Sequence, residues 1–169
     1  VIDPATVAHY VKGVLMLWQP VSDIPLMHSV DDLGQAPFDS MRIGMANPAH
    51  APYGMAARQA LEGLNLWERL EPNVVYGENV GQVFQFAKTG NVGAAFLPLS
   101  LVQLDWDGVL RVDESLYDPM LHGMGIMART KERSAAETFC NYLRGPEAAA
   151  VFERYGFTIP ASSESPETE

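Results

Sequence analysis

The stretch MRIGMANPAHAPYGMAARQAL, residues 41–61, predicts the unit around which the chain is organised: a short buried strand, a tight turn and a helix. Apolar residues alternate along its first six positions, which is the spacing of a strand. The Asn-Pro pair that follows ends the strand, because proline offers no N–H to a sheet. Pro52 suits the first position of a helix, where an N–H would have no intrahelical partner. The N–H groups of Tyr53 and Gly54 therefore lie at an open helix N-terminus.

A second stretch, residues 74–90, repeats this arrangement. Residues 74–76 are strand-like, and Asn79 is a favourable N-cap. Gln82 follows three residues later, at the spacing of a capping box. The apolar residues of 80–88 share one helix face, and a glycine ends the pattern. The free donors of this second terminus are the N–H groups of Val80 and Gly81.

Together the two helix starts predict a site that holds a small anion through neutral N–H groups. A helix N-terminus carries about half a positive charge and unpaired N–H donors. Tyr53 adds a phenolic hydroxyl, and His50 and Asn79 lie in the adjoining turns. Every strand–helix unit of an α/β domain has such a terminus, so ordinary helix starts are the alternative reading of the same pattern.

The residues of these two stretches resemble the periplasmic molybdate-binding proteins of ABC importers. The resemblance covers residues 1 to about 160, in order. It is carried by NPAHAPYG at 47–54, LW at 66–67, GENV at 77–80, Phe86, GN at 90–91, and the C-terminal runs 143–149 and 152–159. It implies a type II periplasmic-binding-protein fold that takes molybdate or tungstate in a cleft between two lobes.

For the site, the resemblance implies two ligand-binding residues, Tyr53 and Val80, acting through backbone N–H groups. Gly54, Gly81, Asn79 and His50 are weaker candidates. Phe96 stands where some family members have a tyrosine, and it brings no hydroxyl. No cofactor is expected, and no metal apart from that in the bound oxyanion. The implied partner is the membrane permease of the importer, and the implied location is the periplasm.

For domain organisation, alternating strands and helices predict an α/β fold with a mainly parallel sheet. The resemblance implies one nearly complete lobe, residues 14–120, with the C-terminal helices of the other lobe in residues 121–160. Residues 1–13 would be a remnant of that other lobe, whose oxyanion-binding turn has no match here. The chain is therefore expected to lack most of the first lobe, to bind oxyanion weakly by itself and to self-associate through the apolar helix faces of residues 134–155.

Three local predictions concern the ends of the chain. Asp3-Pro4 is a helix start signal, so residues 1–12 are expected to form a short helix. Ser134, with Glu137 three residues later, is expected to cap a helix that runs to residue 144. The tail 161–169 has no apolar face and is expected to be disordered.

Composition limits the function classes. Of 169 residues, 47% are hydrophobic and 19% charged, which is typical of a globular protein. The net charge of −10 argues against nucleic-acid binding and against long-range attraction of anions. Cys140 is the only cysteine, which excludes an internal disulfide. A binding protein rather than an enzyme is expected. The alternatives are an enzyme, which would need a perturbed acid or base, and a regulator's effector domain, either one binding another small anion on the same fold.

Overall fold

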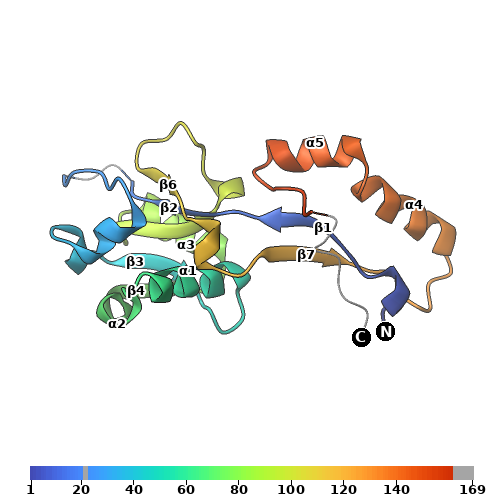
Figure 1. Ribbon diagram of the computed structural model, residues 1–169, viewed down its shortest axis with the longest axis horizontal. Coiled ribbons are helices and arrows are strands. Elements are labelled where there is room, and N and C mark those ends of the chain that lie inside the picture. The colour runs from blue at the N-terminus through green and yellow to red at the C-terminus, as the bar shows by residue number, and fades with distance from the viewer. Residues whose placement is uncertain (21–22, 162–169) are drawn as a thin grey trace. The chain divides into compact units, whose positions relative to one another are not determined.

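The computed structural model describes residues 1–20 and 23–161, and the chain divides into two compact units (Figure 1). One unit comprises residues 14–120, and the other combines residues 1–13 with the segment from residue 121 onward. Among the helices described, none is both long enough and apolar enough to cross a membrane. The expectation of a disordered tail falls on residues 162–169, which lie outside the described part of the chain.

The unit of residues 14–120 is built on a five-stranded sheet with the order β4-β3-β5-β2-β6. The strands are β2 (Leu15–Trp18), β3 (Ile43–Ala46), β4 (Val74–Gly77), β5 (Ala94–Pro98) and β6 (Val109–Arg111). Strand β3 is parallel to β4 and β5, whereas β2 is antiparallel to β5 and β6. The α/β class is confirmed, but the sheet is mixed, with β2 alone reversed. Among the described residues, α-helices join only β3 to β4 and β4 to β5, and a parallel pair needs such a crossover.

Helices cover both faces of this sheet and create two apolar cores. Helix α1 (Pro52–Gly63) and the short α2 (Trp67–Leu70) pack in one core with Leu15, Leu17 and Ile43. Helix α3 (Val80–Lys88) packs in the other core with Val14, Met16 and Leu97. Alternate residues of β2 thus enter opposite cores, so this strand is buried on both faces. The 3-10 helices of this unit are Val30–Gly34, Phe38–Ser40, Glu71–Asn73, Leu99–Leu101 and Glu114–Leu116.

The second unit contains a two-stranded sheet of β1 (Ala8–Gly13) and β7 (Met120–Met124), with helices α4 (Arg133–Leu143) and α5 (Pro146–Arg154). The expected helix over residues 1–12 is wrong beyond its first turn. Asp3 does cap a 3-10 helix, Pro4–Thr6, but β1 follows it directly. Strand β1 has β7 as its partner, and the Lys12 N–H donates to the Thr158 carbonyl at 2.8 Å on its other side. These distant hydrogen-bond partners override the local start signal.

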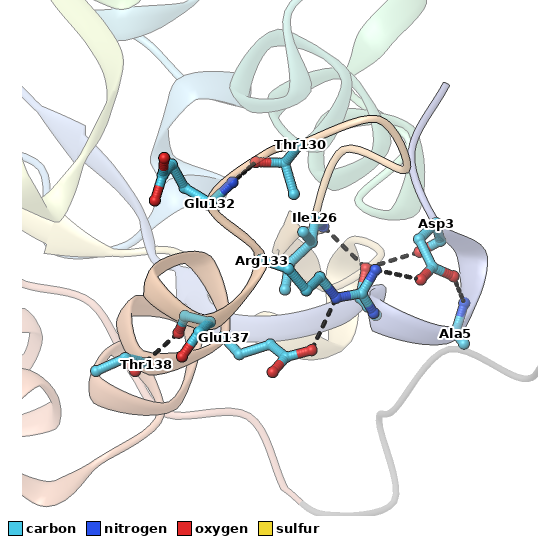
Figure 2. Close-up of polar contacts among 10 residues, drawn as sticks. Asp3, Ala5, Ile126, Thr130, Glu132, Arg133, Glu137 and Thr138 are labelled. Atoms are coloured by element: carbon cyan, nitrogen blue, oxygen red, sulfur yellow. Dashed lines mark hydrogen bonds and ion pairs between the residues drawn. The ribbon is translucent and has the colours of Figure 1, made fainter.

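The start of α4 also differs from the expected one (Figure 2). Ser134 lies inside the helix, which begins at Arg133 after a turn in which the Thr130 hydroxyl accepts from the Glu132 N–H at 3.1 Å. Glu137 is not available for a capping box, because it binds the Arg133 Nε at 2.7 Å. The same guanidinium reaches Asp3 at 2.8 Å and so ties α4 to the first turn of the chain.

Candidate functional site

The candidate site lies where the parallel strands β3 and β4 end side by side. Ala46 and Gly77, their last residues, are paired in register, and the Asn47 N–H donates to the Gly77 carbonyl at 2.9 Å. Each strand continues through a short turn into a helix, α1 or α3. Because parallel strands end on one edge of a sheet, both helices begin at this edge, which is where open α/β sheets bind ligands.

Asn47 organises the turn between β3 and α1. Its side-chain oxygen accepts from the Ala49 N–H at 3.0 Å, and its carbonyl accepts from the N–H groups of His50 and Ala51 at 3.3 and 2.9 Å. An asparagine side chain that binds its own backbone two residues later is a common way to close such a turn. From the sequence alone, Asn47 was predicted only to end the strand. The Asn-Pro pair at positions 47 and 48 was the sequence signal for this turn.

The N-terminus of α1 is open, as expected. Pro52 occupies the first helical position, and Ala51 before it makes no side-chain capping hydrogen bond. The first N–H with an acceptor four residues earlier is that of Met55, which donates to the Ala51 carbonyl at 3.0 Å. The N–H groups of Tyr53 and Gly54 precede it and therefore have no acceptor within the helix.

Gly54 has a structural role that the sequence did not reveal. It is buried, and an added Cβ would lie 2.0 Å from the Ala46 carbonyl oxygen. The first turn of α1 therefore rests directly on the end of β3, at a distance that only glycine permits. This close approach fixes the position of the neighbouring Tyr53 N–H relative to the sheet edge.

Only some of the N–H groups in the first turn of α3 have acceptors. The Asn79 side chain accepts from the Gln82 N–H at 3.0 Å, and the Val83 N–H donates to the Asn79 carbonyl at 3.2 Å. The N–H groups of Val80 and Gly81 precede these donors and have no acceptor in the helix. The expected capping box is wrong in one detail: Gln82 accepts from the Glu78 N–H, at 2.7 Å, in place of the Asn79 N–H.

A surface pocket of about 450 Å³ at this edge brings together some of the predicted residues. It is lined by Asn47, His50, Tyr76, Gly77, Glu78 and Asn79. His50 and Asn79 therefore line the same pocket. Tyr53, Gly54, Val80 and Gly81 are not part of its lining. Tyr76 belongs to the pocket but was not anticipated, because its exposed position on β4 shows no pattern in the sequence.

The Tyr53 side chain is half-buried and packs against the core that contains α1. Burial raises the pKa of its hydroxyl to about 12, and the nearby Tyr117 adds to the increase. The hydroxyl therefore keeps its proton at neutral pH and remains a hydrogen-bond donor. Phe96, by contrast, is 1% exposed within β5, so it is part of the packing between strands and helices.

The chemistry of this edge is that of neutral donors rather than of a catalytic or metal centre. The groups at this edge include backbone N–H donors at two helix starts, the hydroxyls of Tyr53 and Tyr76, and the side chains of His50 and Asn79. The Glu78 carboxylate at the pocket would oppose an anion, so an anion placed here would have to be held by local, oriented donors. In the part of the chain that the structure describes, no three His, Cys, Asp or Glu side chains form a potential metal site.

Comparison with known proteins places the chain in a family. The family model described as bacterial extracellular solute-binding protein matches residues 1–158. The molybdate-binding protein ModA of Azotobacter vinelandii is 35% identical over 158 residues, covering 89% of this chain. A putative ABC transporter substrate-binding lipoprotein of Bacillus subtilis, YvgL, is 34% identical over 122 residues, covering 71% of this chain.

Solved structures agree in fold. The periplasmic molybdate-binding protein of Azotobacter vinelandii superposes with a TM-score of 0.80 at 26% identity, covering 95% of this chain and 71% of that one. The chain spans only 47% of YvgL and 60% of the Azotobacter ModA sequence. The match to the family model nevertheless extends over nearly the whole chain, and the family consists of solute-binding proteins rather than enzymes. The chain belongs to the bacterial extracellular solute-binding protein family.

Proposed function

We propose that this chain is part of the solute-binding component of an ABC importer and that its ligand is molybdate or tungstate. The oxyanion would be held by the backbone N–H groups of Tyr53 and Val80, with the Tyr53 hydroxyl as a further donor. Gly54, Gly81, Asn79 and His50 would flank it. No cofactor takes part, because the oxyanion is itself the ligand.

One observation carries this proposal: two helices with free N–H groups begin at the paired ends of β3 and β4. Both termini project partial positive charge toward one edge of the sheet. The relatives named molybdate-binding proteins support the choice of ligand. The acidic chain adds no long-range attraction, which agrees with a site that works through local dipoles.

We propose a partner and a cellular location for the protein as well. A binding protein of this kind would deliver its ligand to a membrane permease, and it would do so in the periplasm or outside the cell. The unit of residues 14–120 would be one nearly complete lobe of that protein. The other unit would be part of the second lobe.

The ligand preference can be tested directly. Donors without an acceptor favour an anion that carries no proton, and molybdate and tungstate are dianions at neutral pH. Phosphate keeps a proton that would face a donor, so its binding should be weaker by about 1–3 kcal/mol. Calorimetric titration of the full-length protein with each anion measures the difference. Phosphate that displaced molybdate at a similar concentration would contradict the proposed site.

We also propose that the 169-residue chain self-associates through α4 and α5. Two residues of the expected apolar face are exposed, Phe139 at 61% and Val151 at 48%, whereas Phe152 is half-buried against Tyr10 and Phe157. Tyr142 and Tyr155 are also more than half exposed. Exposed apolar side chains promote association where they lie together. Light scattering should therefore give a mass above 18.5 kDa, and Phe139→Ser with Val151→Ser should restore the monomer. A monodisperse monomer of the unaltered chain would contradict this proposal.

A further inference from the structure

Three surface depressions lie beside β4 and α1 and share lining residues. The first is the 450 Å³ pocket of the candidate site, which shares Asn47 and Tyr76 with a second depression of about 530 Å³. The second depression shares Arg58 and Glu62 with a third, of about 560 Å³, which reaches Trp67. Because neighbouring depressions have common walls, the three form one path that leads away from the candidate site. We call this path the β4 groove.

The β4 groove is acidic. Its walls carry the carboxylates of Glu62, Glu68, Glu71 and Glu78. Arg58, the one lysine or arginine among the residues lining it, is already bound to Glu62 at 2.8 Å and lies 5.0 Å from the centre of the Trp67 ring. In the described residues, no ion pair involves Glu68, Glu71 or Glu78. Glu62 raises the pKa of Arg58 and Glu71 adds to the increase, but four carboxylates to one arginine leave the groove with a net negative charge that suits a cationic partner.

The groove also offers apolar contact and a free sheet edge. Met55 and Tyr76 are 49% and 44% exposed, and both line it. Strand β4 is at the edge of the sheet. Since the Gly77 carbonyl accepts from Asn47 on the β3 side, strand alternation turns the Tyr76 N–H and carbonyl outward. An extended segment can pair with such an edge through backbone hydrogen bonds.

We propose that the β4 groove docks a basic, extended segment of the importer's membrane component. The inference rests on the function proposed above. Acidic walls select a cationic partner, the open edge of β4 selects an extended one, and exposed Met55 and Tyr76 supply apolar contact. The groove begins at the pocket lined by His50 and Asn79, two residues that would flank the proposed site, so its occupant would lie beside the site. We assign the segment to the membrane component because that component receives the ligand. Cationic side chains of the segment would attract the dianion when it leaves the binding protein.

The test compares two variants with the same change in net charge. Glu68→Gln with Glu71→Gln removes charge from the groove, whereas Asp105→Asn with Asp107→Asn removes it from an exposed loop elsewhere. Binding of the molybdate-loaded, full-length protein to the membrane component in lipid nanodiscs is measured for each. The groove variant should bind ~tenfold more weakly or worse, and the loop variant should bind like the parent. A second pair of variants tests the apolar contact. Tyr76→Ala should weaken binding to the membrane component, and Leu104→Ala, at an exposed residue outside the groove, should not.

Two further measurements keep the outcomes separate. Thermal unfolding must show that all four variants fold, and calorimetry must show that the Glu68→Gln/Glu71→Gln variant binds molybdate like the parent. Equal binding of groove and loop variants to the membrane component would overturn the docking proposal and leave the proposed function intact. A parent that bound no molybdate would instead remove the proposed function, on which this inference depends. If the groove variant changed only the oligomeric state, the occupant would be a second copy of the chain, contrary to the proposal.

Discussion

Val80→Pro is expected to weaken oxyanion binding by about 1.5–3 kcal/mol, the scale of one hydrogen bond to a charged group. Val80→Ala keeps the backbone N–H and should leave the affinity nearly unchanged. Val80 is the first residue of α3, and Asn79 before it has extended backbone angles. Proline is well tolerated at a first helical position and prefers an extended residue before it. The substitution therefore removes one N–H donor while leaving the helix in place.

Calorimetry on the two variants and the parent measures this effect, and thermal unfolding is the control for folding. Tyr53→Phe, tested in the same way, separates the phenolic hydroxyl from the backbone N–H at the other helix start. Equal molybdate affinities for Val80→Pro and the parent would remove Val80 from the site.

Gly54→Val should lower the free energy of unfolding by about 3 kcal/mol or more, through overpacking against backbone. The new Cβ would meet the Ala46 carbonyl oxygen at 2.0 Å, and neither backbone can move without separating α1 from β3. The site would be lost with the packing, because α1 carries the Tyr53 N–H.

The matched control is Gly81→Ala, in the first turn of α3. A Cβ at Gly81 would meet only the Asn79 side-chain oxygen, at 3.2 Å, and the position is exposed. Its effect on stability should stay within about 1 kcal/mol, the difference in helix propensity between glycine and alanine. Urea unfolding of the two variants provides the comparison, and equal stabilities would show that α1 does not rest on β3 as closely as described.

Features governed by neighbouring residues were predictable from the sequence. The bounds of α3, its Asn79 cap, and the start of α1 at Pro52 agree with the structure. Capping, proline geometry and helical periodicity act within one or two turns, so the sequence alone contains the necessary information. The same reasoning located the four backbone N–H groups at the two helix starts.

Features that depend on distant partners were decided by the tertiary structure. Residues 8–13 became a strand because β7 and residue 158 supply hydrogen bonds more than a hundred positions away. Strand β2 runs opposite to its neighbours, and the described residues between it and β3 form 3-10 helices in place of an α-helical crossover. The close approach that requires glycine at position 54 forms only once α1 has packed on β3. The groove beside Tyr76 likewise forms only once β4 and α1 are in place. Local propensity differs by about 1 kcal/mol between alternatives, so pairing and burial across the fold outweigh it.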